Sequence, residues 1–246
     1  VVFHWNQKVT AVTAPKVGEI ELTLSSGAGL AVADLLVCAG RTAPTAALNP
    51  AAAGIGLTSH GLVPVDEHYR TAVPHIYAVG DVIGFPALAS TSSEQGRVAA
   101  CHACGSAYKK KIAPVLPTGI YTIPEVSCAG LTEPQAREKG IDYVVGRGEY
   151  SHNPRGQIIG DKAGFLKLVF ARSDMKLLGV HVIGELATEV VHVGLMGLMT
   201  GATAELFLDT CFNYPTLGDL YKLAATDAYL KRNKLGPDPN ILEERW

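Results

Sequence analysis

The chain has 246 residues, of which 48% are hydrophobic and 18% are charged, with a formal net charge of -2. This composition is typical of a folded globular protein with one large or two modest domains, and it excludes extended disorder. The near-neutral charge gives no electrostatic case for a nucleic-acid partner, because the basic run at 109–111 is too short to form a binding patch.

The cysteine content and hydropathy indicate the compartment. Five cysteines are scattered without the spacing of a disulfide framework, which favours a reducing environment. No stretch reaches the roughly 18 consecutive apolar residues that a membrane-spanning helix needs. We therefore expect a cytoplasmic protein without a membrane partner. The first residues, VVFHWNQKVT, read like the middle of a strand without an initiator Met or a signal peptide, so we expect a truncated amino end.

The amino-terminal third reads as β structure. Residues 1–36 alternate between polar and apolar side chains, which predicts antiparallel strands with turns at TAPKVGE and SSGAG. The segment ADLLVCAG predicts a fully buried strand that ends at Gly40. After an irregular Pro- and Ala-rich segment and a short extended piece, HIYAVGD at 75–81 predicts a second buried strand.

Helical patterns begin at Thr91, where Thr91 and Glu94 spell a capping box and predict a helix that ends at Gly105. Residues 105–118 read as a linker. Beyond it the pattern is α+β, and two or three helices close the chain. The predicted elements there are a short helix opened by Thr132 and stopped by Gly140, strands near 142–150, 164–171 and 177–183, and a helix over about 185–199 that we expect to be buried because apolar residues surround it.

Both predicted buried strands end at a glycine followed by a charged residue, Gly40-Arg41 and Gly80-Asp81. Open sheets bind ligands beyond the carboxyl ends of their strands. Gly80 permits a close backbone approach, Asp81 can accept hydrogen bonds from sugar or polyol hydroxyls, and a helix starting near Leu88 offers free N–H groups to an anion. This combination suits a nucleotide cofactor. The alternatives are that Asp81 only caps a turn and that Arg41 pairs with a nearby carboxylate.

Five stretches carry a resemblance to a known family. They are DLLVCAGRTAPT, LVPVDEHYRTAVPHIYAVGDVIGFPALASTSSEQGRVAA, TGIYTIPEVSCAGLTE, GVHVIGELATEVVHVG and FNYPTLGDLYKLAA. In order and spacing they resemble the carboxyl-terminal half of the flavoprotein disulfide reductase family, across 1–232. The resemblance implies an α/β plus α+β fold class. The implied parts are the end of an NAD(P)-binding Rossmann-like domain at 1–47, the last segment of an FAD-binding domain at 48–115, a dimerisation domain at 116–232 and a tail at 233–246.

The same resemblance implies FAD as cofactor and NAD(P)H as substrate. It implies Asp81 on the ribityl chain, the backbone at Leu88 and Ala89 at the pyrimidine edge of the flavin, and a homodimer formed through 116–232. Gly40, Arg41 and Gly80 complete the expected cofactor-binding residues. The family's two Gly-rich fingerprints and its redox cysteine pair are absent, and SGAGLAV predicts a hairpin turn. We therefore expect the chain taken alone to hold FAD poorly or not at all.

The segment NYPTLGDL bears on the reaction. Family members that handle disulfides carry a His here, followed five residues later by Glu, and that His serves as acid-base partner to a thiol at the other subunit's flavin. Tyr214 and Asp219 occupy these positions. An ordinary phenol loses its proton only near pH ~10, which disfavours thiol chemistry. Hydride transfer between NADPH and NAD+ requires no net proton from the protein, so the resemblance favours transhydrogenation, with Tyr214 and Asp219 as catalytic-site candidates.

Other functions stay open. One is dihydrolipoyl dehydrogenase or another disulfide reductase of the same family, and another is a dimerisation fragment without catalysis, in which Tyr214 is an interface aromatic. Cys101 and Cys104 spell CxxC inside a predicted helix, and without a second cysteine pair we expect ordinary helix residues and no metal site. His181 and His192 lie in apolar patterns typical of core or interface histidines.

Overall fold

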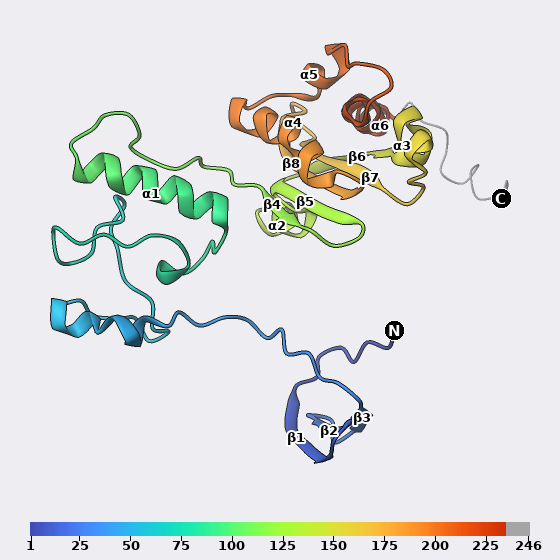
Figure 1. Ribbon diagram of the computed structural model, residues 1–246. Helices are drawn as coiled ribbons and strands as arrows, with labels where there is room; N and C mark the ends of the chain where they lie inside the picture. Colours follow the sequence, from blue (N-terminus) through green and yellow to red (C-terminus); the bar gives the residue numbers. More distant parts are fainter. Residues whose placement is uncertain (235–246) are drawn as a thin grey trace. The chain divides into compact units, whose positions relative to one another are not determined.

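The computed structural model describes residues 1–234 and divides into two compact units, Val1–Pro44 and the part that begins at Thr45 (Figure 1). The predicted tail, 233–246, lies almost entirely outside the described residues. The boundaries predicted at 47/48 and 115/116 stay predictions.

The first unit is a three-stranded antiparallel sheet in the order β1–β2–β3. Its strands are β1 (Val9–Lys16), β2 (Glu19–Leu24) and β3 (Gly29–Val32). The predicted turns are confirmed, with Gly18 at φ 78° and Gly27 at φ 85°, in a region that glycine enters without strain. SGAGLAV therefore forms the β2–β3 hairpin and its second strand, as predicted.

The buried strand predicted at 33–40 is wrong. This segment forms no strand, and Leu36 and Val37 are 86% and 72% exposed. An extended apolar segment becomes a core strand only when neighbouring strands satisfy its backbone N–H and C=O groups. The described residues provide no such neighbour, because the sheet of this unit ends at β3.

The second predicted core strand, 75–81, is also absent as a strand. A single antiparallel bridge joins Tyr77 to Arg70, and residues 76–79 are only half-buried. The segment is extended but lies in a narrow hairpin instead of a parallel sheet. The reason is the same, since no described strand lies beside it.

A five-stranded sheet forms the core of the second unit, and all its pairs are antiparallel. Its strands are β4 (Thr118–Ile120), β5 (Glu125–Gly130), β6 (Tyr143–Glu149), β7 (Phe165–Ala171) and β8 (Leu177–Gly184), in the order β4–β5–β8–β7–β6. The three strands predicted near 142–150, 164–171 and 177–183 are confirmed. The two short strands β4 and β5 were not predicted.

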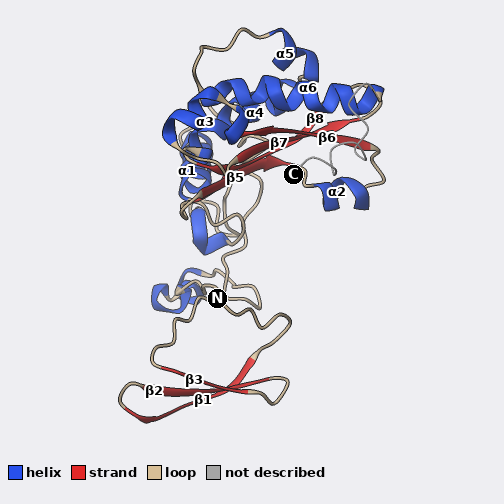
Figure 2. Ribbon diagram, turned by 90° about the vertical axis from the view of Figure 1, so that its right-hand side faces the viewer, coloured by secondary structure: helices blue, strands red, loops and turns tan. Residues whose placement is uncertain are grey.

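Helices cover one face of this sheet. Figure 2 shows α4 and α6 lying across it and α2 on the opposite side. The helices of the unit are α1 (Ala89–Ala103), α2 (Glu133–Glu138), α3 (Pro154–Ile159), α4 (Ala187–Thr200), α5 (Ala204–Asp209) and α6 (Leu220–Asn233). The main core lies between the sheet and its helices, around fully buried residues such as Phe170, Phe207 and Tyr221.

The starts of α1 and α2 and the burial of α4 agree only in part with the prediction. Thr132 and Gln135 form the expected capping box of α2. The capping box predicted at Thr91 and Glu94 is wrong, because α1 begins earlier, with Leu88 as N-cap, and Thr91 is buried inside the helix. The expectation that 185–199 is buried all round is also wrong, because one face of α4 is open and Met196 is 56% exposed.

Candidate functional site

The Gly80-Asp81 pair lies in a tight turn directly before α1. Gly80 is buried with φ 79° and opens the 3-10 turn Gly80–Ile83, which has no side-chain cap. The Asp81 side chain is exposed, and no hydrogen bond or ion pair is formed by its carboxylate within residues 1–234. Asp66, in contrast, is bonded within its own loop. The Asp81 carboxylate is therefore available to accept hydrogen bonds from a ligand.

The amino end of α1 is equally open. Its N-cap, Leu88, has an apolar side chain and makes no cap hydrogen bond. Ser92 is the first residue whose N–H bonds back within the helix, to the Leu88 carbonyl at 2.8 Å. The N–H groups of the first turn, beginning with Ala89, are thus left for another acceptor, and the positive end of the helix dipole lies there.

Two side chains of α1 hold the Gly80 turn. The Gly80 N–H donates to Oε1 of Gln95 over 2.7 Å, and Gln95 is only 2% exposed. A Cβ added at Gly80 would lie 3.1 Å from Oγ of Ser92, so the turn packs directly on the helix. Ser92 in turn donates to the Leu88 carbonyl at 2.9 Å. The structure therefore packs the turn that carries Gly80 and Asp81 against α1, the helix that begins at Leu88 and Ala89.

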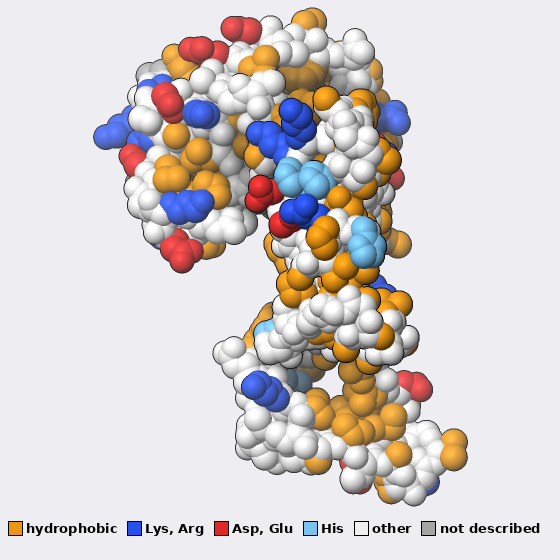
Figure 3. Space-filling view, turned by 90° about the vertical axis from the view of Figure 1, so that its left-hand side faces the viewer, with side chains coloured by type: hydrophobic (Ala, Val, Ile, Leu, Met, Phe, Trp, Pro, Cys, Tyr) orange, Lys and Arg blue, Asp and Glu red, His pale blue; other side chains and the backbone are white. Residues whose placement is uncertain are grey.

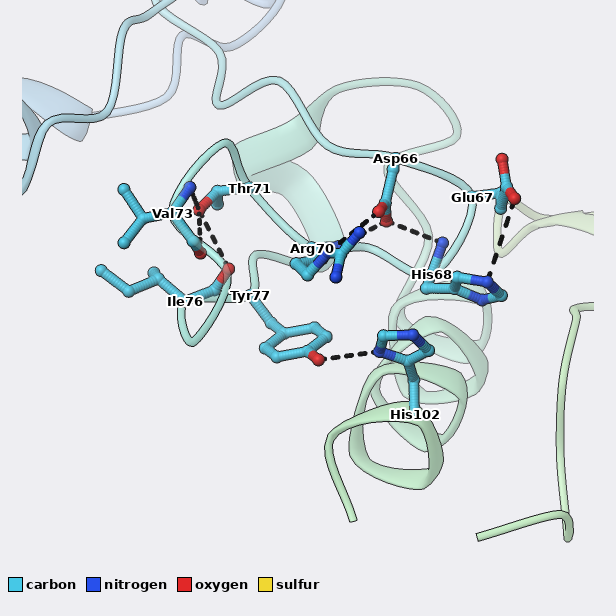
Figure 4. Close-up of polar contacts among 9 residues, drawn as sticks. All are labelled: Asp66, Glu67, His68, Arg70, Thr71, Val73, Ile76, Tyr77 and His102. Carbon is cyan, nitrogen blue, oxygen red and sulfur yellow. Dashed lines mark hydrogen bonds and ion pairs between the residues drawn. The ribbon is translucent and has the colours of Figure 1, made fainter. Parts of the chain in front are cut away.

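The segment that leads into this turn is held by a hairpin, shown in Figure 4. Asp66 Oδ1 accepts from the backbone N–H groups of His68 and Arg70, both at 2.9 Å. The hydrogen bond from the Arg70 backbone is the largest cause that lowers the pKa of Asp66, and the Arg70 charge adds to it. Thr71 Oγ1 donates to the carbonyl of Ile76 at 3.0 Å, so both strands of the hairpin are fastened.

A histidine pair connects the hairpin to the carboxyl end of α1. The Tyr77 hydroxyl and His102 Nδ1 are 2.7 Å apart, and the His68 and His102 rings stack with centroids 4.3 Å apart (Figure 4). Figure 3 shows histidine side chains beside lysine or arginine on this side of the molecule. A hollow of about 200 Å³ here is lined by His68, Val98, Cys101, His102, Gly105, Ser106, Lys109 and Lys110. Tyr77 and Gly80 are thus both attached to α1, Tyr77 at His102 and Gly80 at Gln95. The two attachment points lie seven residues apart along the helix.

Tyr214 and Asp219 lie in the segment directly before α6. Tyr214 is 76% exposed, and Asp219 is half-buried as the N-cap residue of α6. No hydrogen bond joins the two side chains within the described part of the chain. The loop is positioned by Asn153, which is fully buried and donates from Nδ2 to the Thr216 carbonyl at 3.0 Å.

Gly40 and Arg41 belong to the first unit, and the residues around Gly80 belong to the second. Gly40 has φ 109°, and the Arg41 side chain is exposed and forms no ion pair with any described carboxylate.

Metal and membrane features can be stated for residues 1–234. In this range no group of three or more His, Cys, Asp or Glu side chains is arranged to hold a metal ion. No helix in the same range has the length and apolar character needed to cross a bilayer. All five cysteines are free, with Cys101 inside α1 and Cys104 at its carboxyl cap.

Sequence reasoning missed Gln95 and Asn153. A signal was present for Gln95, because Thr91, Gln95 and Val98 recur at helical spacing and place a polar amide on the stripe that should face the core. A buried amide needs a partner, which suggests a structural bond across the turn. Asn153 precedes a proline, and its N-cap role for α3 was readable from that order, but its contact with Thr216, 63 residues away, was not.

Two family models match the chain. One, pyridine nucleotide-disulphide oxidoreductase, matches residues 1–96, and the other, the dimerisation domain of the same group, matches residues 116–225. Together they cover most of the chain, in the order that the resemblance predicted. The chain belongs to the pyridine nucleotide-disulphide oxidoreductase family. The predicted fold class is confirmed, and the second unit contains this family's dimerisation domain.

Individual relatives agree with the family models. A soluble pyridine nucleotide transhydrogenase of Mycobacterium bovis is 45% identical over 96% of this chain and 50% of that protein, and one of Colwellia psychrerythraea is 41% identical over 90% and 50%. Among solved structures, LpdA of Mycobacterium tuberculosis matches with a TM-score of 0.80 and 25% identity, over 90% of this chain and 48% of that one. The HOCl-induced flavoprotein disulfide reductase RclA of Escherichia coli matches with a TM-score of 0.79 and 27% identity, over 88% and 50%. The chain spans about half the length of these relatives.

Proposed function

We propose that the protein containing this chain is an FAD-dependent oxidoreductase that transfers a hydride between NADPH and NAD+. The observation that carries the proposal is the unpartnered Asp81 carboxylate beside the uncapped first turn of α1, joined through Gly80 and Gln95. Support for the particular reaction comes from the printed names of the bacterial relatives, which are soluble pyridine nucleotide transhydrogenases at 41% to 45% identity.

The residues present fit FAD. A ribityl chain carries hydroxyl groups, which are the donors that a free carboxylate such as Asp81 accepts. A flavin ring carries carbonyl oxygens, which are acceptors for the N–H groups that follow Leu88. Gly80 fits as well, because its missing side chain lets the backbone turn sharply against Ser92. We propose Gly80, Asp81, Leu88 and Ala89 as residues that hold this cofactor.

Bound FAD would supply a ring that takes up a hydride from one nicotinamide and gives it to another. The residues of the chain itself would bind the cofactor and orient its ring. The amino end of α1 would place its positive dipole end toward negative charge on a reduced flavin, an interaction that contributes up to about 2 kcal/mol when partly buried. Gly40 and Arg41 remain proposed cofactor-binding residues on the first unit, where the exposed Arg41 guanidinium forms no ion pair with any carboxylate of residues 1–234.

Tyr214 and Asp219 are proposed at the acid-base position of the family's disulfide-handling members. Transfer between two nicotinamides leaves no proton for the protein to move, so an exposed phenol such as Tyr214 suffices there as a packing or hydrogen-bonding group. A change of Tyr214→Phe is therefore expected to reduce transhydrogenation only slightly.

We further propose a homodimer that forms through 116–232 in a reducing cytoplasm. An open apolar row on α4 supports the dimer, with Val193, Met196 and Met199 exposed by 40%, 56% and 41%. Leu206 on α5 is 49% exposed and is a further apolar side chain available for such an interface. Apolar patches of this kind mark association surfaces. The free state of all five cysteines supports the compartment.

A second candidate, a disulfide reductase, is favoured by one observation, the TM-score of 0.79 with the flavoprotein disulfide reductase of Escherichia coli. One experiment separates the two. The complete gene product is purified, its visible flavin spectrum is recorded, and NADPH is supplied with thionicotinamide-NAD+, lipoamide or glutathione disulfide. Rapid reduction of thionicotinamide-NAD+ alone supports the proposal. Rapid disulfide reduction supports the second candidate, and a colourless protein rejects both.

A further inference from the structure

We propose that Gln95 is a positioning residue for the flavin site: it holds the Gly80 amide and so sets the direction of Asp81 relative to the first turn of α1. This inference rests on the proposed FAD site. Gln95 lies two turns inside α1 and is not itself expected to contact the cofactor.

The bond between Gln95 and Gly80 is built into the packing. Gln95 is 2% exposed and Gly80 is buried, so neither group can exchange its partner for bulk water. The N···O distance is 2.7 Å, at the short end of the range for amide hydrogen bonds. A buried N–H without an acceptor is strongly unfavourable, so the turn depends on this oxygen.

The turn has no substitute for the Gln95 amide. Val79, which precedes Gly80, provides no side-chain cap, and Gly80 itself adopts φ 79°. Ser92 supports the turn only by van der Waals contact, because its hydroxyl donates to the Leu88 carbonyl. The next attachment of this segment to α1 is at Tyr77, through His102. In the segment from Tyr77 to Asp81, the backbone is thus held to α1 by the hydrogen bond from the Gly80 N–H to the Gln95 side chain.

The bond between Gln95 and Gly80 affects the position of Asp81 relative to the first turn of α1. Asp81 follows Gly80 directly, and the free N–H groups lie at the start of the helix that carries Gln95. A cofactor held by both needs them at a fixed separation. Removing the Gln95 oxygen leaves the Asp81 carboxylate and the free N–H groups of α1 intact, but the distance between them is no longer fixed.

The test compares three variants in the complete gene product. Gln95→Leu removes the acceptor at similar volume, Gln95→Glu keeps an acceptor oxygen in the same place, and Gln157→Leu is the matched control. Gln157 lies on α3, where it is exposed and donates from Nε2 to the Ser151 carbonyl. The dissociation constant of FAD is measured by titrating the flavin-free protein, together with the visible circular dichroism of the bound flavin.

We expect Gln95→Leu to weaken FAD binding by at least about tenfold and to alter the dichroism band, and Gln95→Glu to stay within about threefold of wild type. Gln157→Leu should match wild type. Equal binding by wild type and Gln95→Leu would overturn the inference, and so would equal losses in Gln95→Leu and Gln95→Glu.

Folding and cofactor effects are separated by a further variant. If Gln95→Leu does not fold, Gln95→Met takes its place, and failure of both apolar variants to fold would overturn the positioning role in favour of a purely structural one. A wild-type protein that binds no FAD would overturn the proposed function itself, a result distinct from any difference among the variants.

Discussion

The backbone amide of Gly80 is bonded to the side chain of Gln95 over 2.7 Å, across fifteen residues of sequence. This buried bond joins the turn that presents Asp81 to the helix whose amino end is uncapped. Two groups that are each unremarkable along the chain thereby become neighbouring parts of one candidate site.

Loss of the Asp81 carboxylate should weaken cofactor binding and leave the stability of the fold unchanged. Because this side chain is exposed and unbonded within residues 1–234, Asp81→Asn should leave the unfolding midpoint unchanged. Hydrogen bonds to a charged acceptor contribute about 1.5–3 kcal/mol, so FAD affinity should fall by about 10- to 100-fold. Fluorescence titration of the flavin-free full-length protein measures this. Asp209→Asn, an exposed aspartate at the end of α5, is the control, and equal affinities in the two variants would refute the role of Asp81.

A methyl group at Gly146 should destabilise the second unit. A Cβ there would lie 1.9 Å from the Ala224 carbonyl oxygen and 2.7 Å from the Ala228 amide, so β6 and α6 would have to separate. Overpacking of this kind is expected to cost about 2–4 kcal/mol. Gly96→Ala is the control, because no atom lies within 4 Å of its added Cβ in α1, and it should gain about 0.5–1 kcal/mol. Urea denaturation distinguishes the two, and similar midpoints would contradict the close packing of α6.

The stability of the chain should fall as the pH drops below 6.5, in part through His181. Burial lowers the pKa of His181 from 6.5, so the unfolded chain takes up a proton in a pH range where the folded chain resists it. Stability is therefore complete above this pH and is lost as the pH falls through the folded-state pKa. We expect His181→Gln to reduce the loss of unfolding free energy between pH 7.5 and about 5.5. The exposed His192, changed to Gln, is the control, and an identical loss in both variants would argue against His181.

A charge on the open face of α4 should prevent dimerisation. Met196 is 56% exposed in the middle of the apolar row, so Met196→Glu would bury a carboxylate in the proposed interface. We expect the full-length protein to shift from dimer to monomer in sedimentation velocity, with the helix content of the second unit retained. Thr226→Glu on the exposed side of α6 should remain dimeric. A dimeric Met196→Glu variant would place the interface elsewhere.

The antiparallel parts of the fold were predictable from the sequence. Burial alternates strictly along β6 (Tyr143–Glu149) and with interruptions along β7 and β8, and a period of two follows from the strand conformation alone, whatever the partner strand. The capping box of α2 was readable for the same reason, because Thr132 and Gln135 lie within one turn. Gly80, Asp81, Leu88 and Ala89 were chosen from their order along the chain, and their role in cofactor binding stays a prediction.

The two failed strand predictions have the same cause, the absence of a neighbouring strand among residues 1–234. The apolar runs at 33–40 and 75–81 have the composition of core strands, yet a core strand requires partners on its edges, and the described residues offer none. The start of α1 was misplaced because Thr91, an apt N-cap by type, turns inward and is 2% exposed.

The sequence by itself thus determined the family, the hairpin turns of the first unit, the strands β6, β7 and β8, and the presence of a carboxylate after a glycine turn, because these depend on residue types at short spacing. Only the tertiary structure decided that Gln95 holds Gly80 and that Asn153 holds the loop of Tyr214. Such bonds join segments that are far apart along the chain, and their geometry follows from how helices pack rather than from any local pattern.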